Sequence, residues 1–171
     1  MPIIIEGKAM KYGDNINTDL IMNNAHAVLT GPEWKAIGKY CLYNLDPTFV
    51  ERVVQGDVLV AGRNFGCGSS KPAAISLIGA GIECVIAKSF SRLFFRNCIN
   101  LGLLPVESAE LADTIQEGDR LQIDLSGNFC INVTQEWHKP LPTYPHLIRE
   151  LIESGGIANW IKGKGTVRYD K

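Results

Sequence analysis

The chain has 171 residues, the usual size of one domain, and it is long enough to bury a substantial core. Its formal net charge is −1, and no basic block or interleaved aromatic stripe points to nucleic acid as a partner. No apolar run approaches the ~20 residues that span a bilayer, and the N-terminus lacks the basic start of a signal peptide. We therefore expect a cytoplasmic protein with neither membrane nor nucleic-acid contacts.

The cysteines and histidines do not form the pattern of a metal site. Five cysteines occur, at positions 41, 67, 84, 98 and 130, and no two form a C-x-x-C pair. Their odd number argues against a disulfide framework, and their spacing matches neither a zinc nor an iron–sulfur ligand set. The three histidines are scattered. We expect this chain alone to hold no metal ion.

The first third of the chain predicts a strand, a loop and two helices. Residues 2–12 alternate and then become apolar, which predicts an opening strand. Residues 12–21 are crowded with Asp, Asn and Thr, which build turns with their own side chains. They are interpreted either as a loop that leads into a short strand or as part of a functional site. Residues 22–31 predict a surface loop, Pro32 begins a helix to about Leu42, and residues 47–53 predict a second short helix.

A glycine-rich turn, Asn64-Phe-Gly-Cys-Gly-Ser-Ser-Lys-Pro-Ala-Ala74, is the most informative stretch. It connects a strand predicted over residues 57–61 to a helix predicted over residues 72–80. Gly66 and Gly68 allow positive φ angles and a close approach of the backbone to a ligand. The turn is neither a Walker phosphate loop nor a dinucleotide fingerprint.

The residues after these glycines suit an anion. Ser69 and Ser70 are predicted to cap the new helix, where free N–H groups and the helix dipole favour negative charge. Lys71 adds a full positive charge beside them. The turn is therefore interpreted as a carboxylate or phosphate site, or alternatively as a tight strand–helix connection with a serine cap.

Two strand–helix–strand units predict the parallel part of a sheet. A helix that starts at Ser89 or Ser91 and runs to about residue 101 lies between strands predicted over 84–87 and 103–106. Residues 120–125 and 129–133 alternate and are flanked by turn signals, which predicts an antiparallel hairpin.

Two arginines lie four residues apart in the helix that ends near residue 101. Arg92 and Arg96 share a helix face, which is usually solvated surface. Because this helix follows a strand directly, an arginine in its first turn is alternatively placed to reach the end of the sheet that carries Ser69.

Four sequence blocks in this order carry a family resemblance. They are Gly13-Asp-Asn-Ile-Asn-Thr-Asp19, Gly56-Asp-Val-Leu-Val-Ala-Gly62, Asn64-Phe-Gly-Cys-Gly-Ser-Ser70, and Ala87-Lys-Ser-Phe-Ser-Arg-Leu-Phe-Phe-Arg-Asn97 with Asn100-Leu-Gly102. With them the chain resembles, over about residues 5–165, the small subunit of 3-isopropylmalate dehydratase and homoaconitase, which corresponds to the swivelling fourth domain of aconitase. The resemblance implies an α/β fold, a single swivelling β/β/α domain over residues 1–171. It has a mixed sheet partly closed like a barrel, flanking helices, and a C-terminal helical extension over about 144–163.

The resemblance also implies an enzyme that works only with a partner. A large subunit would carry a [4Fe–4S] cluster on its own cysteines, and this chain would bind no cofactor. The reaction would be dehydration and rehydration of a hydroxy dicarboxylic acid, with isopropylmalate of leucine biosynthesis as the default substrate. The alternatives are a homoaconitase-like or dimethylmalate-type dehydratase, and a non-catalytic relative that binds a carboxylate. The isolated chain is expected to be inactive and to self-associate through its docking face.

Individual roles follow from the matching positions. Ser69 matches the family's catalytic serine, which acts as an alkoxide base, and Thr18 and Asp19 match residues that orient the base and the leaving hydroxyl. The expected substrate-binding residues are Gly68, Ser70, Lys71, His26 and Arg92.

Two short stretches differ from the usual pattern. Most members follow the Ser-Ser pair with Arg-Glu-His or Arg-Glu-Ser, whereas this chain has Lys71-Pro72-Ala73. Members commonly carry an Arg-Tyr pair where this chain has Ala25 and His26. Arginine binds a carboxylate through two parallel N–H bonds and lysine does not, so these changes bear on the choice of substrate.

Overall fold

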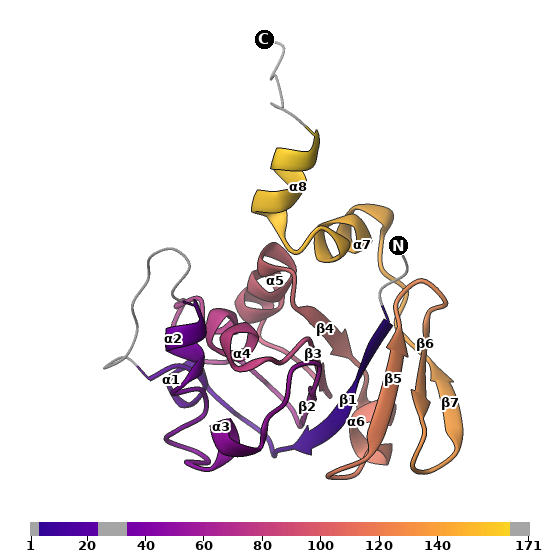
Figure 1. The fold of residues 1–171 in the computed structure, drawn as a ribbon, viewed down its shortest axis with the longest axis horizontal. Coiled ribbons are helices and arrows are strands. Elements are labelled where there is room, and N and C mark those ends of the chain that lie inside the picture. Colours follow the sequence, from indigo (N-terminus) through magenta and orange to yellow (C-terminus); the bar gives the residue numbers. More distant parts are fainter. Residues whose placement is uncertain (1–3, 24–33, 165–171) are drawn as a thin grey trace.

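The computed structural model describes residues 4–23 and 34–164, which form a seven-stranded mixed sheet with helices around it (Figure 1). The strands are β1 (Ile4–Lys11), β2 (Val58–Ala61), β3 (Cys84–Ala87), β4 (Leu104–Glu107), β5 (Arg120–Asp124), β6 (Phe129–Asn132) and β7 (Trp137–Pro140). The helices are α1 (Thr18–Ile21), α2 (Trp34–Gly38), α3 (Phe49–Arg52), α4 (Ala74–Ala80), α5 (Arg92–Leu101), α6 (Ala109–Thr114), α7 (His146–Glu153) and α8 (Ile157–Lys164). Within these ranges, no helix is both long enough and apolar enough to cross a membrane.

β1 joins the two halves of the sheet, whose strand order is β4-β3-β2-β1-β5-β6-β7. Its first part, Ile4–Lys8, pairs antiparallel with β5, and its last part, Ala9–Lys11, pairs parallel with β2. β2, β3 and β4 continue the parallel half, and β5, β6 and β7 form an antiparallel meander. The expected mixed sheet that closes into a half-barrel is confirmed.

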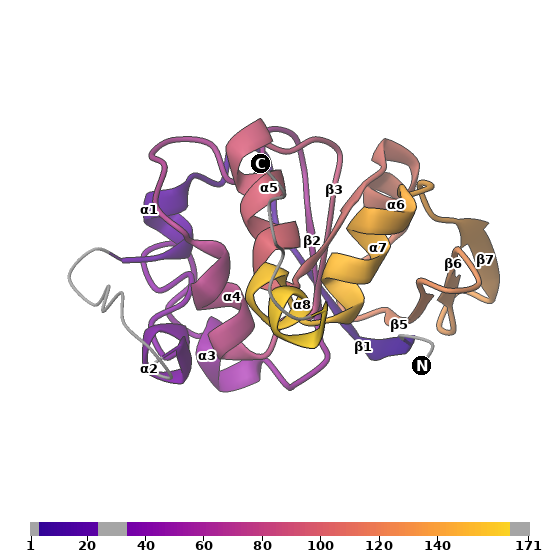
Figure 2. The ribbon, with the colours of Figure 1, turned by 90° about the horizontal axis from the view of Figure 1, so that it is seen from above.

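Each face of the parallel strands carries a hydrophobic core, because successive side chains point to opposite faces. The first core contains Val58, Val60, Cys84, Ile86, Leu104 and Val106, together with Leu111, Ile115, Leu151 and Ile152 from α6, α7 and the segment after α6. The second core contains Leu59, Ala61, Val85 and Ala87, together with Ile21, Phe49, Phe65, Leu77 and Phe94. Figure 2 shows α1–α4 gathered on one side of the parallel strands and β5–β7 on the other. All residues of β2 and β3 are buried, as is usual for parallel strands covered on both faces.

Most of the predicted elements are confirmed, with small shifts of their ends. The strands predicted over residues 2–12, 57–61, 84–87 and 103–106 are present, as are the antiparallel hairpin and the helical C-terminal extension, which consists of α7 and α8. The prediction of a strand after residue 18 is wrong, because Thr18–Ile21 is a short helix. The Asn17 side chain caps it by accepting the Leu20 N–H at 2.9 Å. Helix α2 ends at Gly38 rather than Leu42, which has a left-handed φ of +54°.

Two short elements were not predicted. Helix α6 has six residues, and its Ser108 cap accepts the Leu111 N–H at 3.2 Å. Strand β7 is a four-residue edge strand that exists through its pairing with β6. Both depend on neighbours that a local pattern does not reveal.

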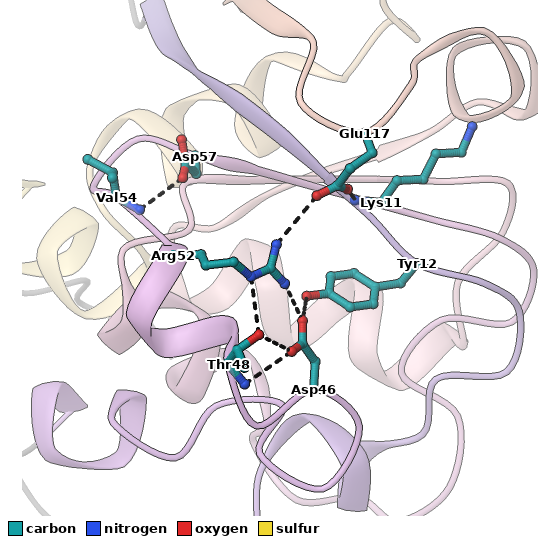
Figure 3. Close-up of polar contacts among 8 residues, drawn as sticks. All are labelled: Lys11, Tyr12, Asp46, Thr48, Arg52, Val54, Asp57 and Glu117. Carbon is teal, nitrogen blue, oxygen red and sulfur yellow. Dashed lines mark hydrogen bonds and ion pairs between the residues drawn. The ribbon is translucent and has the colours of Figure 1, made fainter.

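A polar network fixes the point where β1 leaves the sheet (Figure 3). Asp46 accepts hydrogen bonds from the Tyr12 hydroxyl at 2.7 Å and the Thr48 hydroxyl at 2.8 Å, and it forms an ion pair with Arg52. Arg52 also lies 3.5 Å from Glu117, which accepts the Lys11 N–H. The network therefore ties the end of β1 to helix α3 and to the turn before β5.

We expect the Asp46→Asn substitution to lower the free energy of unfolding by about 2 kcal/mol at pH 7, since it weakens hydrogen bonds to a charged group. Partial burial raises the pKa of Asp46, but the hydrogen bonds from Tyr12 and Thr48 and the Arg52 charge bring it below its ordinary value. A lowered folded-state pKa gives stability above pH ~4 that is lost as the pH falls through that pKa.

Urea unfolding at pH 7 and at pH ~3 tests this prediction. The difference in the free energy of unfolding between wild type and variant should be smaller at the lower pH. Glu153→Gln, at an exposed residue of α7, is the control and is expected to change stability little at either pH. A difference for Asp46→Asn that is independent of pH would contradict the role of the charge.

Candidate active site

Three loops meet where the parallel strands β1, β2 and β3 end. The loop after β2 lies between the other two. On one side the Gly66 N–H donates to the Ile16 carbonyl at 2.8 Å. On the other side the Phe65 N–H donates to the Ser89 carbonyl at 3.0 Å, and the Ser91 N–H donates to the Phe65 carbonyl at 2.9 Å. The carboxyl ends of parallel strands are the usual position for a ligand in α/β sheets.

Two glycines are required in the central loop. Gly66 has a φ of +75°, and a Cβ placed there would lie 2.1 Å from Cγ of the buried Phe94 ring. Gly68 has a φ of +103°, and a Cβ there would lie 3.3 Å from Thr18 Oγ1. The expected positive φ at both glycines is confirmed. Residues that carry a side chain rarely adopt such φ angles.

Thr18 and Ser69 are brought together although they are far apart in the sequence. The Ser69 N–H donates to Thr18 Oγ1 at 3.1 Å, and the two hydroxyl oxygens also lie 3.1 Å apart. Thr18 is 1% exposed, whereas Ser69 lies at the surface. The Thr18 N–H donates to the Cys67 carbonyl at 2.8 Å, so backbone and side chain both hold the loop. The result is an exposed serine hydroxyl on a fixed support.

Lys71 and Asp19 form an ion pair beside this contact. The Lys71 ammonium also donates to the Met22 carbonyl at 3.4 Å. The Lys71 side chain is 13% exposed and the Asp19 carboxylate is 62% exposed. The ammonium is therefore held in place, while much of its carboxylate partner faces solvent.

Ser69 and Ser70 do not cap a helix, so that prediction is wrong. Helix α4 begins at Ala74, and its cap residue Ala73 makes no side-chain hydrogen bond. Both serines lie in the exposed bend before it. Because the dipole effect is confined to the first turn of a helix, positive charge near Ser69 comes from Lys71.

Arg92 starts helix α5 at the same end of the sheet as the glycine-rich loop. Its neighbour Ser91 caps the helix and donates its hydroxyl to the Gly66 carbonyl at 2.7 Å. Arg92 lines a cavity of about 330 Å³ together with Arg96, and Ser69 is not among the residues that line it. The two sites are therefore adjacent but separate. His26, with Ala25, lies outside the described residues.

An asparagine pair that was not predicted supports the loops. Asn15 and Asn64 have φ angles of +56° and +58°, and the Asn64 side-chain amide donates to Asn15 Oδ1 at 3.1 Å. Asparagine is one of the few residues that tolerate the left-handed region. The signal in the sequence was the occurrence of both in loops that follow parallel strands.

Comparison with known proteins identifies the family. The model of the aconitase C-terminal domain matches residues 15–111. A 3-isopropylmalate dehydratase small subunit of Caldanaerobacter subterraneus is 42% identical over 161 residues, which cover 94% of this chain and 99% of that protein. The chain belongs to the aconitase C-terminal domain family.

Other relatives agree with this assignment. A 3-isopropylmalate dehydratase small subunit 1 of Archaeoglobus fulgidus is 42% identical over 91% of this chain and 96% of its own length. The crystal structure of 3-isopropylmalate dehydratase from Methanocaldococcus jannaschii superposes with a TM-score of 0.86 at 38% identity and covers 95% of each chain. The aconitase-type fold expected from the sequence blocks is confirmed.

The cysteines of this aconitase-type domain are mostly structural. Burial raises the pKa of the Cys41 and Cys130 thiols to about 12, and it also raises the pKa of Cys84 and Cys98. Cys67, in the glycine-rich loop, is half-buried. In the ranges 4–23 and 34–164, no group of three or more His, Cys, Asp or Glu is arranged to hold a metal ion. The described residues therefore do not fit an iron–sulfur cluster.

We expect Thr18→Val to lower the free energy of unfolding by about 1–3 kcal/mol, because the Ser69 N–H loses its acceptor while the side-chain volume is kept. Amide hydrogen exchange at Ser69 should become faster at the same time. Thr114→Val is the control, since the Thr114 hydroxyl only donates to the Glu110 carbonyl within α6. Unchanged exchange at Ser69 would show that Thr18 does not hold the loop.

Proposed function

We propose that this chain is the small subunit of an aconitase-type hydro-lyase that interconverts 2-isopropylmalate and 3-isopropylmalate by dehydration and rehydration, in leucine biosynthesis in the cytoplasm. The observation that carries the proposal is the exposed Ser69 hydroxyl, supported by buried Thr18 at 3.1 Å. The proposal is supported further by relatives that bear the name of this enzyme's small subunit.

The chemistry requires a base that removes the proton next to a carboxylate, and Ser69 is assigned that role. A free serine hydroxyl is too weak an acid to be deprotonated, so the alkoxide needs a donor. Thr18 has one hydroxyl proton, and it donates either to the Ser69 carbonyl at 3.3 Å or to Ser69 Oγ at 3.1 Å. Only the second arrangement stabilises a deprotonated Ser69. Thr18 therefore acts by stabilising the deprotonated form of Ser69 when its hydroxyl points to Ser69 Oγ.

Lys71 and Asp19 are assigned to bind and orient the polar groups of the substrate. The Lys71 ammonium is positioned to bind one carboxylate of a diacid, and Gly68, Ser70 and His26 are assigned to the same binding task, whereas Arg92 lines the separate cavity at the start of α5. Asp19 holds the ammonium before substrate arrives and is assigned to orient the hydroxyl that leaves. Negative charge that develops on the substrate is stabilised by this fixed cation.

The remainder of the site belongs to a partner. We assign the [4Fe–4S] cluster to a large subunit, where it supplies Lewis-acid activation of the leaving hydroxyl. Residues 1–171 act as one swivel domain, with α7 and α8 as its extension over about 144–163, and isolated chains self-associate. The single chain is then expected to show no turnover.

The experiment that tests the function is anaerobic reconstitution with the large subunit, followed by ultraviolet detection of the unsaturated intermediate. The panel contains isopropylmalate, a dimethylmalate-type hydroxy diacid and the hydroxy tricarboxylic acid whose dehydration gives homoaconitate. The second candidate, a homoaconitase-like or dimethylmalate-type dehydratase, is favoured by Lys71 in place of the family's usual arginine. Activity only with such an acid would select it. No turnover in a stable, cluster-loaded complex would favour the non-catalytic carboxylate-binding relative.

We expect Ser69→Ala to reduce kcat by about 10²–10⁴-fold, the usual contribution of a positioned base, while complex formation is unchanged. Turnover and size-exclusion profile are measured on the same samples. Ser126→Ala, in the exposed turn between β5 and β6, is the matched control and should keep full turnover. Full activity of Ser69→Ala would remove Ser69 from the mechanism.

We expect Lys71→Met to raise KM for the diacid by about 10–100-fold, because a charge-assisted hydrogen bond to a carboxylate is lost. Lys71→Arg keeps the positive charge and should therefore raise KM by less than Lys71→Met does. Initial rates across substrate concentrations measure both variants. Equal KM values for wild type and Lys71→Met would place the substrate carboxylate elsewhere.

A further inference from the structure

A second site lies beside the glycine-rich loop. Phe90, Arg92, Phe95, Arg96 and Glu107 line a cavity of about 330 Å³ between the start of α5 and the end of β4. Both arginines are exposed, and Leu93 beside them is 46% exposed. The cavity is thus an open surface feature with cationic and apolar walls.

The charges in this cavity are unbalanced. No ion pair within residues 4–23 and 34–164 involves Arg92 or Arg96. Glu107 is the one acidic residue of the lining, and its Oε2 accepts the Phe90 N–H at 3.3 Å. Two guanidinium groups that lie four residues apart on one helix face therefore remain available for a carboxylate from outside.

The aromatic wall is connected to the glycine-rich loop. The Phe90 ring packs edge-to-face on Phe95 at a centroid distance of 5.6 Å and on Phe65 at 6.0 Å. Phe65 also packs on Phe94 at 5.3 Å. Phe65 lies one residue before Gly66, so the cavity and the loop that carries Ser69 share one rigid aromatic cluster.

We propose that this cavity is a docking site for an acidic segment of the large subunit, in which an Asp or Glu pairs with Arg96 and Arg92 and an adjacent apolar side chain covers Phe95 and Leu93. This inference rests on the proposed function, since it names the surface through which the two subunits meet. An open surface of this kind fits a protein segment better than a small diacid, because small ligands are largely enclosed by the pockets that bind them.

Titration of the small subunit against a fixed amount of cluster-loaded large subunit tests the proposal, with turnover as the readout. We expect Arg96→Glu to raise the half-saturating concentration by at least about tenfold, because like charges then face each other, while turnover at saturation is unchanged. Arg96→Gln should give a smaller increase and a weaker dependence on salt than wild type. Arg120→Glu, at an exposed arginine of β5, introduces the same charge elsewhere and should leave the titration unchanged.

Circular dichroism confirms that each variant is folded before the titration. The same half-saturating concentration for Arg96→Glu and wild type would overturn the docking proposal. A higher KM for the diacid with unchanged assembly would overturn it in favour of a substrate subsite. Loss of self-association alone, measured by sedimentation, would overturn it in favour of a second copy of the chain. Failure of the wild-type chain to bind any large subunit would instead overturn the proposed function itself.

Discussion

A buried threonine hydroxyl holds the site together. Thr18 Oγ1 accepts the Ser69 N–H at 3.1 Å, and this contact exists only because the loops after β1 and β2 leave the sheet side by side. Parallel pairing of Ala9–Lys11 with Val58–Val60 sets that alignment. The Asp46 network then fixes the exit of β1 from the sheet. Sheet register, loop position and hydroxyl geometry are thus successive consequences of one strand pairing.

The arrangement around Ser69 and Lys71 is open to solvent rather than a closed pocket. Ser69 is exposed, and the Asp19 carboxylate next to Lys71 is 62% exposed. Because its carboxylate is largely exposed, this ion pair contributes little to stability, and its position beside the Thr18–Ser69 contact is better explained by function. A partner surface that excludes water would strengthen every charge interaction at this position. Docking would therefore supply both the missing groups and the low dielectric that the chemistry needs.

The sequence was sufficient for the parts that local chemistry determines. Buried apolar runs predicted the parallel strands, and Gly66 and Gly68 predicted positive φ angles in the loop between β2 and α4. The start of α4 was misplaced, because Pro72 suits a first helical turn but the chain turns into the helix only at Ala74. Strand β7 and the Arg92–Arg96 cavity depend on long-range contacts that no local pattern contains, whereas the short helix at Thr18 has a local Asn17 cap that the strand prediction overlooked.

Coupling between docking and catalysis follows from the aromatic cluster. Gly66 has no side chain because the Phe94 ring occupies the space, and Phe65 lies between Phe90 and Phe94. A segment seated on Phe90 and Phe95 therefore presses on the same rings that support the backbone before Ser69. Close-packed interiors transmit such displacements rather than absorb them. In the proposed complex, the orientation of the Ser69 hydroxyl would thus depend on a surface that the substrate itself does not touch.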